Sequence, residues 1–182
     1  MKKLLLAVVA VMFAATSFAQ DWSVGGRVGS GFQAVGQWRY NDKCHIEARF
    51  GASWTHSVFM YGWSYGDYMD MDIMEGVTSP ITADFTVLHN WRALEMDWTP
   101  KGGIWFLDAG VGINVAGAKH VAYVGAAGLV RLGFTFHKVP LTLGVDWTPI
   151  VGPAICYVPG WEKTDYNLGG LFNFGVSCTY NF

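Results

Sequence analysis

Apolar and polar side chains alternate along most of the chain after residue 20. The segment 168–182 is the clearest case: its even positions are mostly aromatic or aliphatic, and its odd positions are mostly Gly, Asn, Ser and Thr. Successive side chains of a β-strand point to opposite faces, so this pattern predicts strands with one apolar and one polar face. The alternation recurs over 45–54, 81–87, 105–114, 124–136 and 141–147, and no apolar stripe of helical period and length follows the first 20 residues. The sequence therefore predicts an all-β protein.

The connections between these segments predict a closed barrel. Short polar connections lie at 41–43, 100–102 and 137–139, and longer ones at about 57–80 and 153–167. Counted back from the C-terminus, short and long connections alternate, as they do in outer-membrane barrels. Segment 22–40 allows either one strand, which gives seven in all, or two strands with a hairpin at Gly29-Ser30-Gly31, which gives eight. We predict an eight-stranded antiparallel up-and-down barrel with strands at 22–28, 32–40, 44–56, 81–97, 103–115, 121–137, 140–152 and 168–182.

One of these strands requires an irregularity. In strict alternation Arg92 and Glu95 would face opposite ways, although both are charged. An extra residue on one strand reverses the facing of everything beyond it. We therefore predict a β-bulge near Ala93-Leu94.

Charged residues occupy the polar face of the predicted strands. The five lysines after residue 20 all lie in turns or loops, whereas the arginines and most carboxylates lie within strands. Eight strands enclose an interior that side chains just fill, and charges buried there must be paired. We predict a closed interior ion-pair network without a permanent aqueous pore, made of Arg27, Arg39, Glu47, Arg49, Asp84, Arg92, Glu95, Asp97, Asp108, Arg131 and Asp146. A narrow or gated conduit for small solutes is the alternative.

Aromatic residues on the apolar face collect near the strand ends. Trp22, Trp38, Tyr40, Trp98, Trp105, Phe136, Tyr180 and Phe182 lie at the ends joined by short turns, and Phe32, Trp54, Phe85 and Trp147 lie nearer the other ends. Two aromatic girdles around an apolar band are typical of barrels that span a membrane. Alternation alone does not decide which face is outside, so a soluble lipocalin-like barrel remains the alternative.

The first 19 residues have the pattern of an export signal. Lys2 and Lys3 precede an apolar stretch over 4–15, and Ser17-Phe18-Ala19 places small residues at the last and third-last positions of a cleavage site. The stretch is shorter than the roughly 20 residues of a spanning helix, although an uncleaved anchor is the alternative. We expect Sec-type export, cleavage after Ala19, and a single barrel domain over 20–182.

Composition excludes several classes of function. A formal net charge of −2 and 14% charged residues give no basic surplus, so we expect no nucleic-acid partner. The 3 cysteines show neither the pairing of a disulfide framework nor the spacing of a zinc site. We expect no cofactor.

The export signal, the short turns, the long acidic second loop and the ending Thr179-Tyr180-Asn181-Phe182 together resemble the small outer-membrane β-barrel family, which includes the transmembrane domain of OmpA and the OmpX and OmpW barrels. The resemblance covers the chain after the signal and rests on pattern. It implies residence among the lipids and lipopolysaccharide of a Gram-negative outer membrane. It also implies that Tyr180 and Phe182 form a C-terminal signal read by the barrel-insertion machinery.

The long loops offer the remaining candidate sites. Loop 57–80 carries aromatic and acidic side chains suited to contact an external partner: Tyr61, Trp63, Tyr65, Asp67, Asp70, Asp72 and Glu75. Its carboxylates do not follow the spacing of an EF-hand, so a solvated acidic loop is favoured over a calcium site. Gly62-Trp63-Ser64-Tyr65-Gly66 matches the nucleophile motif of hydrolases, but no parallel sheet or following helix is predicted.

His89 is predicted to lie on the apolar face, which raises an enzymatic alternative. Some lipid-A-modifying outer-membrane barrels resemble this arrangement, with a histidine and a serine facing the outer leaflet. In that alternative the protein is a lipid hydrolase or acyltransferase using His56, Ser57, Ser64 or His89. No outward carboxylate is placed to orient a histidine, so we favour a non-enzymatic barrel with a structural or surface-interaction role.

Overall fold

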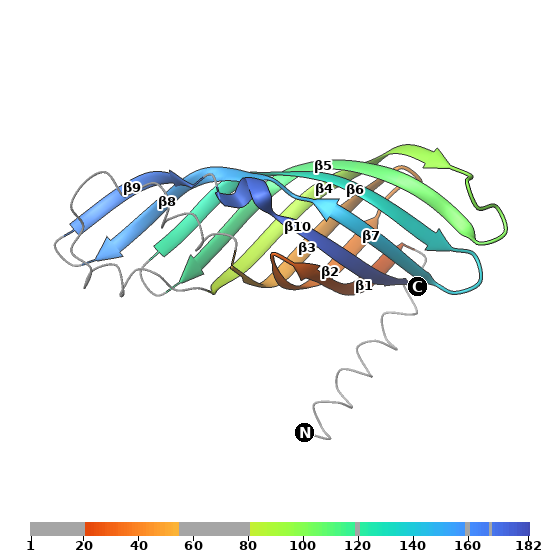
Figure 1. The fold of residues 1–182 in the computed structure, drawn as a ribbon, viewed down its shortest axis with the longest axis horizontal. Helices are drawn as coiled ribbons and strands as arrows, with labels where there is room; N and C mark the ends of the chain where they lie inside the picture. The colour runs from red at the N-terminus through yellow and green to blue at the C-terminus, as the bar shows by residue number, and fades with distance from the viewer. Residues whose placement is uncertain (1–20, 55–80, 119–120, 159–160, 168) are drawn as a thin grey trace, which may run out of the picture.

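The computed structural model describes residues 21–54, 81–118, 121–158, 161–167 and 169–182 (Figure 1). These residues form strands and one short 3-10 helix: β1 (Trp22–Gly29), β2 (Gly31–Arg39), β3 (Cys44–Ser53), β4 (Thr82–Met96), β5 (Gly103–Ala118), β6 (Val121–Phe136), β7 (Leu141–Trp147), β8 (Ile150–Val158), β9 (Trp161–Asn167), η2 (Gly169–Phe172) and β10 (Phe174–Asn181). No helix among them is long and apolar enough to span a bilayer.

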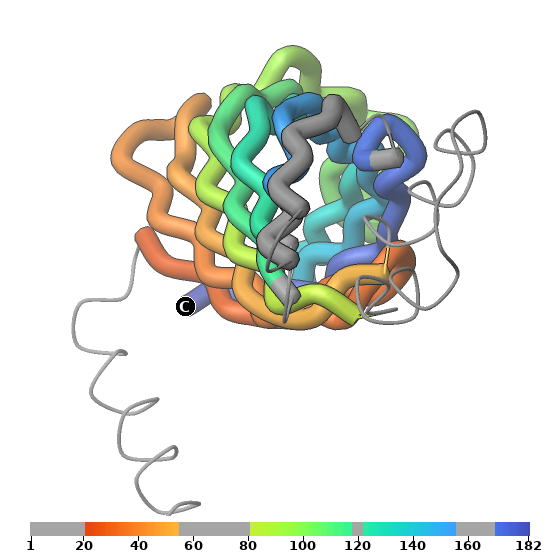
Figure 2. Tube along the Cα trace, turned by 90° about the vertical axis from the view of Figure 1, so that its left-hand side faces the viewer, coloured from red at the N-terminus to blue at the C-terminus, as the bar shows by residue number. Residues whose placement is uncertain are grey.

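The strands close into the predicted antiparallel barrel of eight strand positions (Figure 2). Each strand from β1 to β6 pairs with the next in the chain, and β10 pairs with both β7 and β1. β7 and β8 follow one another along β6 and share one strand position. Closure leaves the β1–β10 seam fully paired from Ser23↔Asn181 to Gly29↔Gly175.

Short connections lie at one end of the barrel, which we call the turn end. It carries the connections 40–43, 97–102 and 137–140, together with the start of β1 and the end of β10, on the right in Figure 1. The Asn41 side-chain oxygen accepts hydrogen bonds from the backbone N–H groups of Lys43 (2.9 Å) and Cys44 (2.6 Å). At 99–102 the Gly102 N–H donates to the Thr99 carbonyl, and Pro100 has the fixed φ that such a turn favours. We call the opposite end the loop end.

Two predicted irregularities are confirmed. β1 and β2 turn at Ser30, with Val28 opposite Phe32, so segment 22–40 is two strands. The register of β4 against β5 shifts between Arg92 and Leu94, which is the predicted bulge. Both features keep the apolar residues of each segment on one face.

The C-terminal third departs from the prediction. The strand predicted at 140–152 is interrupted at Thr148 and Pro149, because proline has no N–H to donate to the ladder. The predicted loop 153–167 is instead largely strand, since β8 continues along β6 and turns back as β9. The predicted strand 168–182 begins with η2, and β10 starts at Phe174. Local alternation gave no indication of the β8–β9 hairpin.

Candidate functional site

The barrel presents its apolar face outward and its charged face inward. Phe50, Val111 and Phe174 are 64%, 57% and 53% exposed on the outer wall, whereas Arg49 and Asp108 are each 1% exposed. Inward polar and outward apolar residues alternate along the strands, as on β4 from Thr82 to Val87. A barrel that folds in water buries its apolar face, so this arrangement is the inverse of a soluble barrel.

Glu47 on β3 is the centre of a buried ion-pair cluster. Arg131 on β6 donates to both carboxylate oxygens of Glu47, with both N–O distances 2.7 Å. Arg49 donates from Nε at 2.6 Å, and Gln37 from its side-chain amide at 2.7 Å. Such two-pronged guanidinium–carboxylate contacts are the geometry that compensates for burial of both charges.

Asp146 on β7 extends the same cluster. Arg27 on β1 donates to its Oδ1 from Nε at 2.8 Å, and Thr148 donates to the same oxygen at 3.0 Å. Arg49 Nη1 lies 3.5 Å from Asp146 Oδ1, and Arg131 Nη2 lies 4.0 Å from Oδ2. Arg49 and Arg131 therefore link the two carboxylates into one connected group.

These contacts cross the full width of the barrel. β3 is separated from β7 by β4, β5 and β6 in one direction and by β2, β1 and β10 in the other, so the two strands lie on opposite walls. Arg49 on β3 nevertheless donates to Thr148, directly after β7, at 2.9 Å. A side chain that spans from one wall to the other occupies the lumen at that level. The cluster thus closes the interior.

A second polar group lies around Asp84 on β4. Its carboxylate accepts hydrogen bonds from Gln33 on β2, from Asn114 on β5 at 2.7 Å and from Thr86 at 3.3 Å. Gln33 also accepts from Arg27 at 3.2 Å, which connects this group to Asp146. Amide and hydroxyl donors from β2, β4 and β5 thus solvate a carboxylate that is 2% exposed.

Apolar side chains fill the interior on the loop-end side of the ion pairs. Leu88, Ala127, Leu129 and Ile150 form one buried cluster. Leu129 and Ala127 lie two and four residues from Arg131 along β6, on the same face. They exclude water from that side of the charges, which strengthens the ion pairs.

At the turn end the charged interior meets solvent. Arg92 contacts Asp108 at 3.1 Å and Glu95 at 3.0 Å, and its guanidinium lies 4.0 Å from the centroid of the Phe106 ring. The outermost members of the predicted network therefore lie at the open mouth of the barrel rather than in its closed interior. Arg39, Glu95 and Asp97 are exposed, because they lie at or beyond the strand ends where the lumen opens.

Glycines on the barrel wall make room for the largest interior side chains. A Cβ at Gly133 would lie 2.1 Å from the Phe106 ring, and one at Gly175 would lie 2.5 Å from the Arg27 guanidinium carbon. A Cβ at Gly110 would lie 2.0 Å from the Asn90 side-chain oxygen. These three glycines are thus required by side chains of neighbouring strands.

Sequence reasoning missed the uncharged members of the interior network. Gln33, His45, Asn90, Asn114 and Thr148 are buried and hydrogen-bonded to its charged members or to one another. Gln33, His45, Asn90 and Asn114 lie on the same face of their strands as the charged residues, and Thr148 follows β7 two positions after Asp146. This shared face was the sequence signal from which their interior position could have been predicted.

Aromatic rings on the outer wall form contacting series near the turn end. Trp22, Trp38, Tyr40, His89 and Trp91 follow one another with centroid distances of 5.9–6.3 Å. Trp98, Trp105, Phe134 and Phe136 form a second series, and Tyr180 contacts Phe182. Towards the loop end Phe32 contacts Trp54, and Trp147 contacts Phe174. The rings therefore gather near both ends of the wall.

His89 belongs to the turn-end aromatic series. It lies on the outer wall as predicted, and its Nε2 is hydrogen-bonded to the hydroxyl of Tyr40. Tyr40 thus orients the imidazole, and the two polar tips satisfy one another on an otherwise apolar surface.

Other candidate residues lie outside the described part of the chain. These are the export signal over 1–19, the loop residues Tyr61, Trp63, Tyr65, Asp67, Asp70, Asp72 and Glu75, and the serines and histidine of the enzymatic alternative at 56, 57 and 64. Among the described residues, no three His, Cys, Asp or Glu side chains lie close enough to hold a metal ion.

Comparisons of the chain with protein-family models, with curated proteins and with solved structures find no match.

Proposed function

We propose that the protein is an outer-membrane β-barrel of a Gram-negative bacterium with a filled interior, and that it has a structural or surface-interaction role. The observation that carries this proposal is the outer wall, which exposes large apolar residues on every side and is bounded by aromatic rings. In water, exposed apolar area of this extent would drive association. In hydrocarbon, exposure of the same surface carries no free-energy penalty, and the buried charges stay paired inside.

The height of the apolar wall supports a bilayer. On β6 the outward apolar residues from Val124 to Phe134, the first β6 ring of the turn-end aromatic series, span ten positions. At about 3.4 Å per residue and a tilt of about 45°, this length corresponds to about 24 Å along the barrel axis. Transmembrane barrels carry an apolar band about 25 Å tall. The two heights agree.

Under this proposal the turn end faces the periplasm and the loop end faces outside, since outer-membrane barrels have short periplasmic turns. Residues 57–80 would then be displayed to an external partner through their aromatic and acidic side chains. Tyr180 and Phe182, whose rings are 5.1 Å apart, would be read by the insertion machinery during assembly.

An arginine on the outer wall tests the membrane setting. We expect Val111→Arg to lower the free energy of unfolding in phospholipid vesicles by about 2–4 kcal/mol, because the charge would lie near the bilayer midplane. Val139→Arg is the matched control, because Val139 is exposed in the turn 137–140. Its cost should be at most about 1 kcal/mol, as found near the interface. Equal effects of the two variants would contradict the proposal.

Planar-bilayer conductance tests the filled interior. Because Arg49 and Glu47 contact partners on other walls, we expect no stable single-channel steps from the inserted protein. Large steps that persist at constant voltage would instead favour the conduit.

A further inference from the structure

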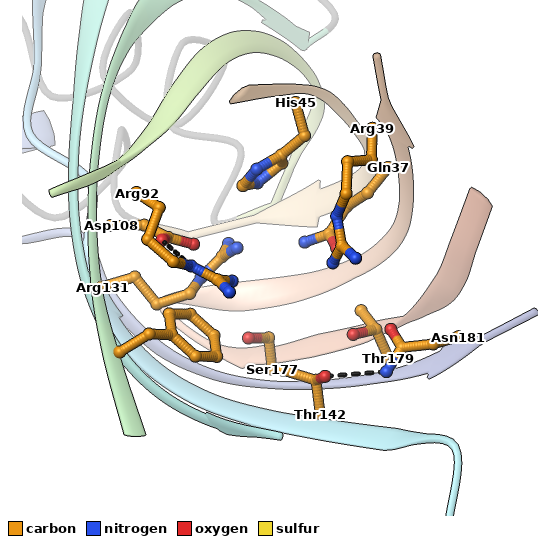
Figure 3. Close-up of a pocket in the computed structure, with 11 residues that line it drawn as sticks. Gln37, Arg39, His45, Arg92, Asp108, Arg131, Thr142, Ser177, Thr179 and Asn181 are labelled. Atoms are coloured by element: carbon orange, nitrogen blue, oxygen red, sulfur yellow. Dashed lines mark hydrogen bonds and ion pairs between the residues drawn. The ribbon is translucent and has the colours of Figure 1, made fainter. Parts of the chain in front are cut away.

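A hollow opens at the turn end of the interior, between the ion-pair cluster and the barrel mouth (Figure 3). β2, β4 and β6 contribute Arg39, Arg92 and Arg131 to its lining, and β7 and β10 contribute Thr142, Ser177 and Thr179. Guanidinium groups from β2, β4 and β6 and hydroxyl groups from β7 and β10 thus surround the hollow.

Among the residues that line this hollow, positive side chains outnumber negative ones. Asp108 is the one carboxylate among its lining residues, and it is paired with Arg92. Arg131 is committed to Glu47, which lies deeper. Arg39 forms no ion pair with any described residue, and Figure 3 shows its guanidinium reaching into the hollow. One positive charge therefore faces the hollow without a protein anion.

β10 contributes to the hollow a threonine hydroxyl that has no hydrogen-bond partner among the described residues. Thr179 is 2% exposed, and its Oγ1 forms no hydrogen bond with the described residues. The neighbouring groups have protein partners: Ser177 Oγ donates to the Gly144 carbonyl at 3.4 Å, Asn181 Nδ2 donates to Thr142 at 2.9 Å, and Asn181 Oδ1 accepts from Ser23 at 2.8 Å. A buried hydroxyl that lacks a protein partner requires one from solvent or from a ligand.

Arg131 adds a second buried donor. Its Nε is buried and has no hydrogen-bond partner among the described residues, although both of its Nη atoms donate to Glu47. The Arg39 guanidinium, the Arg131 Nε and the Thr179 hydroxyl are thus donors among the lining residues from which no described side chain accepts a hydrogen bond. A ligand suited to this site carries negative charge and several acceptor oxygens.

We propose that the turn-end hollow binds a small oxyanion, the phosphate or carboxylate group of a soluble molecule that enters from the turn end. The planar guanidinium of Arg39 would donate two parallel hydrogen bonds to two oxygens of the anion, the geometry that phosphate and carboxylate favour. The Thr179 hydroxyl would donate to a third oxygen. This inference concerns the interior alone, so it does not depend on where the outer wall resides.

Nuclear magnetic resonance on the folded, isotope-labelled protein tests the inference. Sodium phosphate and sodium acetate are titrated in separate arms at constant ionic strength, balanced with sodium chloride. We expect saturable shifts of the Ser177 and Thr179 amides and of the Arg39 Nε–H with at least one of the two anions. Saturation by phosphate alone identifies a phosphate site, and saturation by both identifies a general oxyanion site.

Two variants assign the binding to this hollow. Arg39→Gln should weaken binding about tenfold, and Thr179→Val by a smaller factor, since a charge-assisted hydrogen bond is worth about twice a neutral one. Lys138→Gln is the control, because Lys138 is a turn-end cation that does not line the hollow. The amide spectrum reports whether each variant is folded. Shifts that do not saturate, or that are the same in the Arg39→Gln variant, overturn the inference.

Discussion

Glu47 is the residue on which the interior depends most. Its carboxylate accepts from both Arg49 and Arg131, so Glu47→Gln leaves two buried guanidinium groups short of a negative partner. We expect this variant to lose about 3–5 kcal/mol of unfolding free energy, the usual cost of removing one partner from a buried pair. Urea titration of the folded barrel, followed by tryptophan fluorescence, measures the change.

Glu95→Gln is the matched control for this prediction. Glu95 also contacts an arginine, but its side chain is 55% exposed. The expected loss is at most about 1 kcal/mol, because solvent screens an exposed pair. Comparable losses in the two variants would show that the buried cluster does not stabilise the barrel.

Gly133 tests the close packing of the interior ring of Phe106. Gly133→Ala would place a Cβ 2.1 Å from that ring, and we expect a loss of about 1–3 kcal/mol from overpacking. Adding Phe106→Leu should restore part of the loss. Gly36→Ala is the control, since nothing lies within 4 Å of a Cβ there. If Gly36→Ala costs as much in urea titrations, loss of chain flexibility rather than Phe106 is responsible.

At the scale of the element, the turn at 40–43 offers a direct test. Asn41→Ala removes the acceptor for the backbone N–H groups of Lys43 and Cys44. We expect a loss of about 1 kcal/mol in the same unfolding assay, because each such hydrogen bond contributes modestly and solvent replaces it in part. Asp42→Ala, one residue away, should be close to neutral. A neutral Asn41→Ala would mean that the turn forms without its side-chain oxygen.

The strand positions were predicted correctly where polar and apolar residues alternate to the strand end. Where this alternation stops, the predicted strand bounds were wrong. The hairpin at Ser30 and the bulge after Arg92 followed from parity, because a barrel with a polar interior cannot tolerate a reversed face. Beyond Pro149 the inward residues Ile150 and Ala154 are themselves apolar, and Ile150 belongs to the interior apolar cluster. Inward and outward residues of this segment therefore no longer differ in polarity. The hairpin of β8 and β9 was missed for that reason.

At the scale of the whole molecule, the sequence predicts which residues face inward but not which of them meet. Arg49 and Thr148 share an inward face from strands on opposite walls, and only the closed barrel brings them within 2.9 Å. Their contact depends on strand tilt and register summed around the barrel, which no local pattern records. The same holds for Arg39 and Thr179, which line the same hollow from β2 and β10.

The central claim is that the outer wall contacts hydrocarbon. Spin labels at Val111→Cys, Leu129→Cys and Lys138→Cys, in a background with Cys44, Cys156 and Cys178 changed to serine, test it in vesicles. Electron paramagnetic resonance then compares collisions with oxygen, which concentrates in the bilayer, and with a water-soluble nickel chelate. We expect the label at 111 to favour oxygen strongly, the label at 138 to favour nickel, and the label at 129 to be shielded from both. A label at 111 that collides with nickel as often as the label at 138 would contradict the account.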